Sequence, residues 1–253
     1  MKIARFLYRG KEWFGVMEED HLTVAEGDMF GAFTVTRQGY HLKEVKLLPP
    51  TQPSKIVAVG LNYKDHAEEV KSKLPDEPLL FLKPSSAVIG HRDDIIYPPM
   101  SQRVDYEGEL GVVIGKRAKG VSAAEADTYI LGYTCFNDVT ARDLQQRDKQ
   151  WTRAKGFDTF APLGPWIETE IDPLSLTLET FLNGERKQSS QTSNLIFTPR
   201  HLVSFVSQIM ALYPGDVIAT GTPSGIGPMK VGDTVEVVIE GIGSLVNLLT
   251  TSP

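Results

Sequence analysis

The segment Asp105-Tyr106-Glu107-Gly108-Glu109-Leu110-Gly111-Val112-Val113-Ile114 joins an acidic pair to a continuous apolar run. The run from Leu110 to Ile114 predicts a buried strand, and strand geometry places the side chains of Glu107 and Glu109 on one face. Two carboxylates at that spacing repel each other unless a cation lies between them. Gly108 leaves room for another part of the chain to approach closely. For an isolated Glu-x-Glu pair, a solvated strand face is nevertheless the commoner explanation.

A third carboxylate lies at the end of a later predicted strand. Asp138 follows the strand from Tyr133 to Asn137 and can complete an all-oxygen site with Glu107 and Glu109. Such a site favours Mg2+ or Mn2+, with Ca2+ as a non-native occupant. Zinc is disfavoured because no histidine or cysteine has ligand spacing here. The sequence therefore predicts a magnesium or manganese site.

The composition indicates a globular protein that acts on small molecules. The chain has 253 residues, of which 41% are hydrophobic, so it can bury a full core. Its net charge of -6 comes from interspersed acids and bases, which argues against nucleic-acid binding. The proline-dense segment Leu48 to Pro53 cannot continue a β-ladder. We therefore expect a small N-terminal β domain over residues 1–50 and a larger domain over residues 51–253.

The single cysteine and the apolar segments bear on cellular location. Cys135 lies in an apolar run, where a buried packing role is the commoner one, and it cannot form an intrachain disulfide. Residues 1–5 are not followed by the apolar stretch of a signal peptide. No apolar run approaches the roughly 18 residues that cross a bilayer. These features predict a cytoplasmic protein without a membrane partner.

Hydrophobic patterning predicts many short strands. Residues 3–8 and 13–16 read as strands of the N-terminal region, and Lys55 to Gly60 reads as a buried strand. Because strands and helices do not alternate, a doubly wound sheet and an eightfold βα barrel are disfavoured. We expect a mixed, β-rich α+β fold. Further strands are predicted over residues 110–114, 133–136, 216–220, 234–240 and 244–249.

The polar segment after the first buried strand carries a candidate catalytic pair. Asn62 is suited to cap a helix that continues through Lys71 and is ended by Pro75. The segment is so polar that little of it can pack in a core, which suggests a lid. His66 and Glu69 are neighbours on one helical face, and a histidine oriented by a carboxylate is a competent general base. The alternative is an ordinary surface pair on a charged helix.

Two further helices are expected. The spacing of Ser122 and Glu125 is that of a capping box and predicts a helix toward Tyr129. Thr198-Pro199 predicts the start of an amphipathic helix that Pro214-Gly215 ends. The apolar face of this second helix is formed by Leu202, Phe205, Val206, Ile209 and Met210.

Six ordered motifs resemble the fumarylacetoacetate hydrolase family over roughly residues 51 to 250. The segment 105–115 is similar to the metal-binding strand of that family, and 62–69 is similar to its lid helix. The other motifs are Leu80 to Ser85, Asn137 to Gln145, Trp151 to Phe157 and Thr220 to Gly225. The resemblance implies a β-sandwich roll with flanking helices and a homodimer.

Carried over to this sequence, the resemblance assigns roles to individual residues. It makes Glu107, Glu109 and Asp138 the metal ligands, His66 and Glu69 the catalytic dyad of the lid, and Lys155 the catalytic lysine. A lysine ammonium beside a metal is suited to stabilise enolate or oxyanion charge. Four residues are candidates for substrate binding: Arg142, Gln145, Lys83 and Thr222. The alternative role for Lys83 is an ion pair with the carboxylate of a metal ligand.

The implied chemistry is that of a small 2-oxo or 2-hydroxy-enoic acid that passes through a metal-bound enolate. The first hypothesis is hydrolysis of an acylpyruvate-type C–C bond. The second is decarboxylation or isomerisation, as with oxaloacetate or 2-hydroxyhepta-2,4-diene-1,7-dioate. The third, from another class, is a non-catalytic domain with a structural cation. The N-terminal region is much shorter than that of true fumarylacetoacetases, so tyrosine catabolism is not predicted. The lid and loops such as Gln146 to Gln150 are expected to contact the distal part of the substrate.

Overall fold

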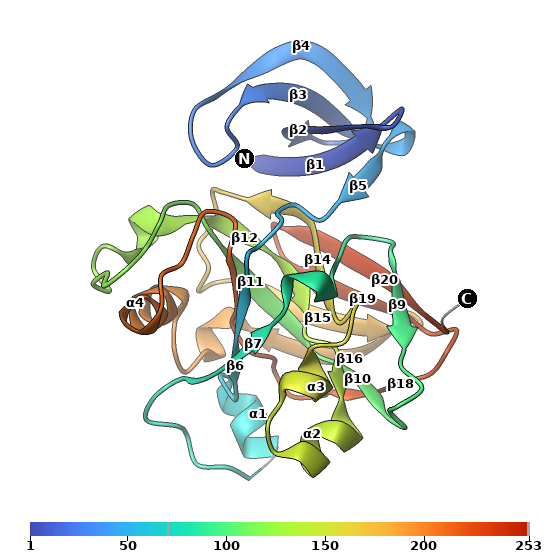
Figure 1. Cartoon of the computed structure of the whole chain (residues 1–253), viewed down its shortest axis with the longest axis vertical. Coiled ribbons are helices and arrows are strands. Elements are labelled where there is room, and N and C mark those ends of the chain that lie inside the picture. Colours follow the sequence, from blue (N-terminus) through green and yellow to red (C-terminus); the bar gives the residue numbers. More distant parts are fainter. Residues whose placement is uncertain (70, 252–253) are drawn as a thin grey trace.

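In the computed structural model, which describes residues 1–69 and 71–251, the chain forms three β-sheets with short helices around them (Figure 1). The strands of the largest sheet are, in order, β4 (Phe33–His41), β3 (His21–Gly27), β2 (Lys11–Glu18), β1 (Lys2–Tyr8), β14 (Ala161–Glu168), β12 (Ile130–Asn137), β11 (Gly108–Ile114), β17 (Val217–Ala219), β6 (Ile56–Gly60) and β7 (Leu79–Lys83). Two short strands lie off this path: β5 (Lys46–Leu48) pairs with β1, and β8 (Val88–Ile89) pairs with β14.

Two smaller sheets and the helices complete the described part of the chain. The second sheet has the order β16 (Glu185–Gln191), β15 (Thr177–Leu182), β19 (Thr234–Ile239), β20 (Gly243–Thr251) and β9 (Asp94–Tyr97). The third consists of β13 (Thr140–Ala141), β10 (Val104–Tyr106) and β18 (Gly227–Met229). The α-helices are α1 (Lys64–Glu69), α2 (Arg142–Asp148), α3 (Thr152–Lys155) and α4 (Pro199–Ile209), and 3-10 turns cover Leu42–Glu44, Ser85–Ala87, Ala126–Tyr129 and Thr192–Asn194. The expectation of a mixed, β-rich fold is confirmed.

The main hydrophobic core lies between the large sheet, the second sheet and α4. β11 lies against β15, and β14 lies against β20. All seven residues of β11 are buried, because β12 and β17 pair with its two edges while the second sheet covers one face. Cys135 is a buried, free thiol in this core. The strand that leads away from Glu107 and Glu109 is therefore rigidly held.

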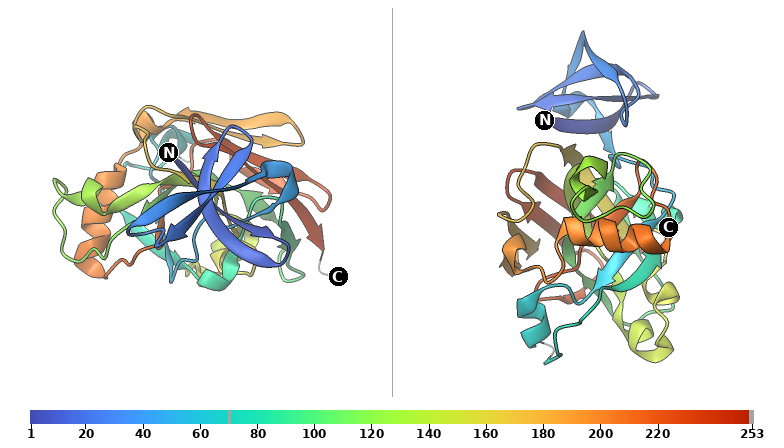
Figure 2. Two further views of the ribbon diagram at one scale, coloured as in Figure 1. Left: turned by 90° about the horizontal axis from the view of Figure 1, so that it is seen from above. Right: turned by 90° about the vertical axis from the view of Figure 1, so that its left-hand side faces the viewer.

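The N-terminal strands form a small layered unit at one end of the molecule (Figure 2). They enclose a hydrophobic cluster of their own, which includes Phe6, Leu22 and Val24. β1 also pairs with β14, through Lys2 opposite Glu168, so the unit is continuous with the large sheet. The division of the chain at residue 50 stays a prediction.

The helix expected to run toward Tyr129 does not form as an α-helix. Ser122 donates its hydroxyl proton to the Glu125 carboxylate instead of capping a helix, and a 3-10 turn covers Ala126–Tyr129. α4 begins at Pro199 as expected, with the Thr198 side chain as its cap. It ends at Ile209, before Pro214-Gly215, and Ile209 is 55% exposed. The expected apolar face was therefore wrong at Ile209, because the buried side of α4 turns toward Val203.

The lid helix has a different start from the one expected. α1 begins at Lys64, and the side chain of Asn62 bonds to Phe197 and Thr220 and does not cap α1. α1 ends at Glu69. The helix was expected to continue through Lys71, but Lys71 lies in a turn with a φ of 52°, so this expectation was wrong at Lys71. Residue 70 lies outside the described residues, as do residues 252–253 of the predicted larger domain. Within the described ranges, no helix is long and apolar enough to cross a membrane.

Candidate active site

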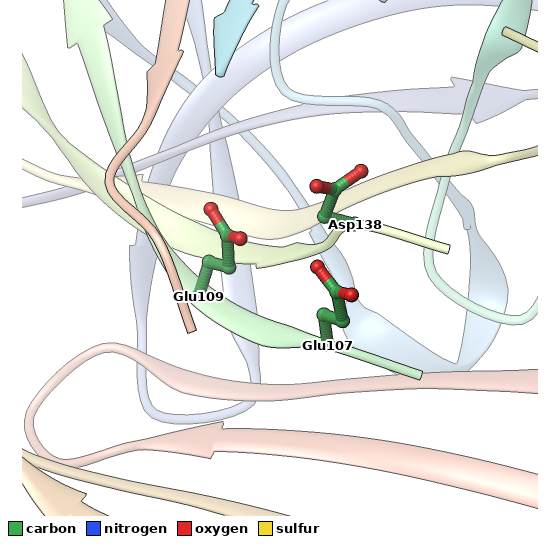
Figure 3. A group of neighbouring side chains, drawn as sticks. All are labelled: Glu107, Glu109 and Asp138. Atoms are coloured by element: carbon green, nitrogen blue, oxygen red, sulfur yellow. The ribbon is translucent and has the colours of Figure 1, made fainter. Parts of the chain in front are cut away.

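Three buried carboxylates converge where β11 and β12 meet. Glu107 precedes β11, Glu109 lies on it, and Asp138 directly follows β12. The Asp138 N–H donates to the Glu107 carbonyl over 2.8 Å, which joins the two ligand segments. One oxygen of each carboxylate lies within 4.8 Å of the others, and Figure 3 shows the three groups facing one another. The same-face arrangement that strand geometry predicts for Glu107 and Glu109 is therefore present.

Lysine and arginine side chains compensate two of these carboxylates. The Lys155 ammonium donates to Glu107 Oε2 over 2.8 Å and to Asp138 Oδ2. Lys83 donates to Asp138 Oδ1 over 2.5 Å, and Arg142 bonds to Glu107 Oε1. Burial by itself raises the pKa of Glu107, but Lys155 and Arg142 lower that pKa to about 2.

Glu109 differs from its two neighbours. It accepts the Gly221 N–H over 2.8 Å, and it has no lysine or arginine partner among the described residues. Burial raises the pKa of Glu109, and the adjacent Asp138 and Glu107 raise it further. A set of three hard, buried oxygen ligands with one uncompensated carboxylate fits a divalent cation such as Mg2+ or Mn2+.

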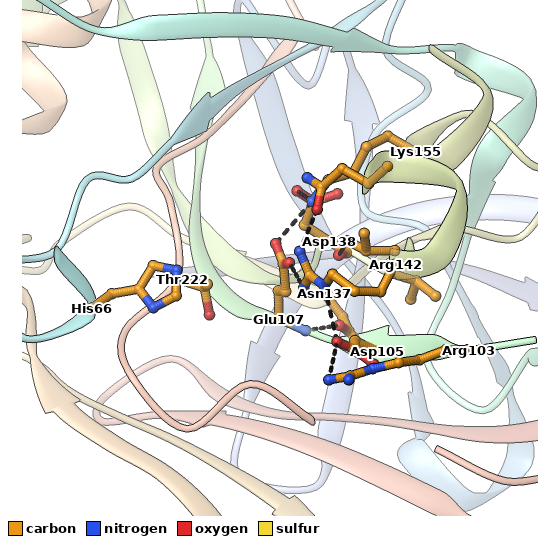
Figure 4. Close-up of polar contacts among 12 residues, drawn as sticks. His66, Arg103, Asp105, Glu107, Asn137, Asp138, Arg142, Lys155 and Thr222 are labelled. Atoms are coloured by element: carbon orange, nitrogen blue, oxygen red, sulfur yellow. Dashed lines mark hydrogen bonds and ion pairs between the residues drawn. The ribbon is translucent and has the colours of Figure 1, made fainter. Parts of the chain in front are cut away.

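The candidate dyad forms on α1. His66 Nδ1 lies 2.9 Å from Glu69 Oε2, and Glu69 Oε1 accepts the N–H of Gly225 over 3.1 Å. In Figure 4, His66 and Thr222 lie on one side of Glu107, and Arg142 and Lys155 lie on the other. His66 therefore faces the carboxylates from α1, as the lid interpretation of the sequence expects.

His66 and the three carboxylates line one pocket of about 190 Å³, and Glu69 is not among its lining residues. Its polar residues include His66, Arg142 and Lys155, which approach from three different helices. An apolar wall completes it, formed by Val59, Gly60, Leu61, Phe81 and Trp151. The expected substrate-contacting loop, Gln146 to Gln150, is not among the lining residues, whereas Gln145 and Trp151 on either side of it are.

The four candidate substrate residues differ in whether they line the pocket and in how far their polar groups are already bonded within the protein. Arg142 donates to Asp105, Gln145 and Glu107, and it lines the pocket together with Gln145. The Thr222 hydroxyl donates to the Gly108 carbonyl over 2.9 Å, so its proton is engaged by the protein. Lys83 is fully buried and does not line the pocket; its second acceptor is the Val139 carbonyl, at 3.1 Å.

Several supporting residues escaped the sequence analysis. Asp105 is buried and bonds to both Arg103 and Arg142, and its alternation with Glu107 and Glu109 along the chain was an available signal. Asn137 Oδ1 accepts the Glu107 N–H over 3.0 Å. Gln188 comes from β16, far away in the sequence, and no local pattern marks it.

Comparison with known proteins identifies the family. Residues 55–250 match the family described as "Fumarylacetoacetate (FAA) hydrolase C-terminal", which is most of the chain. The chain belongs to the fumarylacetoacetate hydrolase family. Residues 1–50 match a separate description, "Rv2993c-like, N-terminal". The expected β-sandwich roll is thus the fold of this fumarylacetoacetate hydrolase family member.

Relatives of this family member include an uncharacterised archaeal protein and an oxaloacetate tautomerase. An uncharacterised protein of Archaeoglobus fulgidus is 58% identical over 97% of this chain and 94% of its own length. The mitochondrial oxaloacetate tautomerase FAHD2B of Bos taurus is 46% identical over 79% of this chain and 68% of its own length.

Solved structures of family members are also similar. The structure described as 2-hydroxyhepta-2,4-diene-1,7-dioate isomerase from Mycobacterium marinum is 42% identical, with a TM-score of 0.93 over 100% of this chain and 99% of that one. Maleylpyruvate hydrolase from Sphingobium sp. SYK-6, solved with manganese(II) and pyruvate, is 28% identical, with a TM-score of 0.83 over both whole chains. This chain is therefore an enzyme of a family whose members include hydrolases and isomerases.

Proposed function

We propose that this enzyme depends on Mg2+ or Mn2+ and hydrolyses a C–C bond in a small acylpyruvate-type 2-oxo acid. One observation carries the proposal: a single small pocket brings together the three carboxylates, Lys155 and His66, and Glu69 pairs with His66 from outside the pocket lining. A purely structural cation site has no use for the dyad or for a lysine that lines a pocket, as Lys155 does. Hydrolysis of such a substrate needs a cation site, a general base and a positive charge beside the forming enolate.

Glu107, Glu109 and Asp138 are the proposed metal ligands. A divalent cation bound there supplies a Lewis acid that stabilises negative charge on the oxygens of the substrate. The manganese(II) ion and pyruvate in the similar maleylpyruvate hydrolase support this choice of metal and of substrate end. Lys83, which is fully buried against Asp138, is best explained as a partner that holds this ligand, since it does not reach the pocket.

His66 is the proposed general base. Its Nδ1 is paired with the Glu69 carboxylate, so Nδ1 carries the ring proton and Nε2 is left to accept one. In the proposed reaction His66 takes a proton from water, and the resulting hydroxide adds to the acyl carbonyl carbon of the substrate. Glu69 stabilises the imidazolium that forms.

Lys155 is the proposed stabiliser of the leaving enolate. When the C–C bond breaks, its electron pair passes into the enolate of pyruvate, and the other fragment leaves as a carboxylic acid. The buried Lys155 ammonium lies between Glu107 and Asp138, beside the place where this charge develops. Return of a proton to the enolate carbon completes pyruvate and regenerates neutral His66.

Arg142 and Gln145 are the proposed contacts for the substrate carboxylate. A guanidinium carries five N–H donors, and three of those of Arg142 bond to Asp105, Gln145 and Glu107. Two donors remain, which suits a carboxylate in the pocket. Thr222 lines the same pocket and contributes its hydroxyl oxygen and its shape.

A second candidate function is isomerisation, keto–enol tautomerisation or decarboxylation of a 2-oxo diacid. The similarity to an oxaloacetate tautomerase at 46% identity and to an isomerase at 42% supports it, because both exceed the 28% identity to the maleylpyruvate hydrolase. The same residues serve this reaction. The difference is that His66 then moves a proton on carbon and water does not attack.

A substrate panel separates these functions. Metal-stripped protein is given acylpyruvates, oxaloacetate and a 2-hydroxydienoate before and after addition of Mg2+ or Mn2+, and ultraviolet absorbance is followed. Release of pyruvate with a carboxylic acid indicates hydrolysis. Interconversion without fragmentation indicates isomerisation, and release of CO2 indicates decarboxylation. Absence of turnover across the panel, with metal bound, would contradict both candidates.

Two expectations from the sequence stay predictions. A homodimer is tested by light scattering coupled to size-exclusion chromatography. A cytoplasmic location is tested by fractionation of the source cells.

A further inference from the structure

The edge strand β16 contacts both halves of the candidate active site, although none of its residues lines the pocket. Gln188 and Ser190 lie two positions apart and are both buried on one face of β16, while Ser189 between them is exposed. Gln188 bonds to the segment that carries Glu107 and Glu109 and to the loop from Thr220 to Gly225. Ser190 bonds to α1, which carries the dyad.

α1 needs outside contacts to fix its orientation. Its described part has six residues, among which Ala67 alone is buried. A helix this short is marginal by itself in water, so tertiary contacts must hold it. Before α1, the chain is anchored by Asn62, whose amide bonds to the Phe197 and Thr220 carbonyls. A second contact, with β16, holds the first turn of α1.

Ser190 makes that attachment through Asp65. The Ser190 hydroxyl donates to Asp65 Oδ2 over 2.5 Å, and Asp65 Oδ1 accepts the backbone N–H of His66 over 2.7 Å. Asn194 donates to the Ser190 oxygen over 3.1 Å, which leaves the Ser190 proton for Asp65. One carboxylate therefore links β16 to the backbone of His66.

Gln188 ties the same strand to the metal side of the pocket. Its Oε1 accepts the Gly108 N–H over 3.0 Å, between the two candidate ligands Glu107 and Glu109. Its Nε2 donates to the Thr222 hydroxyl over 2.8 Å and to the Pro223 carbonyl over 2.9 Å. Residues two apart on one strand face thus fix the carboxylate segment and the dyad segment at a set separation.

We propose that Ser190 is a positioning residue, which holds His66 in register with the carboxylates through Asp65. This inference rests on the proposed function, in which His66 transfers the proton. Loss of the Ser190 hydroxyl frees the first turn of α1 and leaves the carboxylates and the pocket wall in place. The consequence is a slower proton transfer without a loss of metal or substrate binding.

The kinetic test compares Ser190→Ala with Ser189→Ala, its exposed neighbour. A small misplacement of a catalytic group lowers rates strongly, so Ser190→Ala should lower kcat on the order of 10- to 100-fold. The KM of Ser190→Ala should equal that of the wild type, and so should its Mn2+ affinity measured by calorimetry. Ser189→Ala should match the wild type in kcat, KM and Mn2+ affinity. Asp65→Ala should resemble Ser190→Ala, and the double variant should be no slower than either one. Equal kcat values for Ser190→Ala and the wild type would overturn the inference, as would independent losses in the double variant.

A second measurement does not depend on activity. Amide hydrogen exchange of residues 64–69 should be faster in Ser190→Ala than in Ser189→Ala, while exchange across β11 stays unchanged. Unchanged exchange in residues 64–69 would overturn the inference even if no substrate of the panel is turned over. Inactive wild-type protein with the expected exchange would refute the proposed function and leave the attachment of α1 standing.

Discussion

The ammonium group of Lys155 lies 2.8 Å from Glu107 Oε2, and both side chains are almost fully buried. Lys155 ends α3, whereas Glu107 precedes β11, so two distant segments meet in this ion pair. Lys155 also lines the pocket, unlike Lys83. The pair therefore places a positive charge at the edge of the candidate metal site, where substrate can reach it.

Replacement of Lys155 by methionine should separate catalysis from metal binding. The variant loses the charge that stabilises the enolate, so kcat should fall on the order of 100- to 1,000-fold. Mn2+ affinity should be equal or higher, because a cation next to Glu107 and Asp138 has been removed. Steady-state kinetics and calorimetry measure the two effects, with Lys116→Met at an exposed position as the control. Weaker Mn2+ binding together with wild-type kcat would contradict the assignment.

Glu109→Gln should abolish the stabilisation that metal gives. Ligand that binds only the folded state raises the free energy of unfolding by about 2.7 kcal/mol at a hundredfold excess over Kd. Wild-type protein should show such a rise in Tm with Mn2+, and Glu109→Gln should not. Without metal the variant should be at least as stable as the wild type, since Glu109 is buried without a cationic partner in the described chain. An equal Mn2+-dependent rise in both proteins would exclude Glu109 as a ligand.

His66→Ala should remove the general base and leave the cation site intact. The expected loss in kcat is on the order of 100- to 10,000-fold, the usual contribution of general acid–base catalysis. Calorimetry should give wild-type Mn2+ affinity, because His66 bonds to Glu69 and not to the carboxylate cluster. His21→Ala, on β3 of the N-terminal unit, is the matched control. Full activity of the His66 variant would refute the dyad assignment.

Gly108→Ala should strain the contact between the two sheets. A Cβ at this position would lie 2.1 Å from Thr180 Oγ1, which belongs to β15. Overpacking of this kind costs about 1–3 kcal/mol in the free energy of unfolding. Thr180 Oγ1 is buried and has no hydrogen-bond partner among the described residues, so Thr180→Ala should restore much of the loss in the double variant. Urea denaturation measures both changes, and an unperturbed Gly108→Ala would contradict the close approach.

The sequence was informative wherever function depends on local spacing. The alternation of Glu107 and Glu109 predicts their common face, and the three-residue spacing of His66 and Glu69 predicts their contact; both are present in the structure. The β-rich character follows from the short, non-alternating apolar runs, and the family from six ordered motifs.

Features that depend on distant segments could not be predicted in this way. Asn62 has the chemistry of a helix cap, but its fully buried amide satisfies the carbonyls of Phe197 and Thr220 instead. Ser190 bonds to Asp65, which lies more than a hundred positions away in the sequence. Gln188 bonds to Gly108, which lies eighty positions away. At Ala126–Tyr129 a 3-10 turn replaces the expected helix, because the Ser122 hydroxyl donates to the Glu125 carboxylate instead of capping a helix.

The most direct test of the account is the rate of pyruvate release from an acylpyruvate as Mn2+ is added back to metal-stripped protein. Wild type and Glu109→Gln are compared side by side. The account predicts no release without metal, a saturable restoration in the wild type, and none in Glu109→Gln. Release at the full rate from the metal-stripped protein, or equal restoration in both, would contradict it.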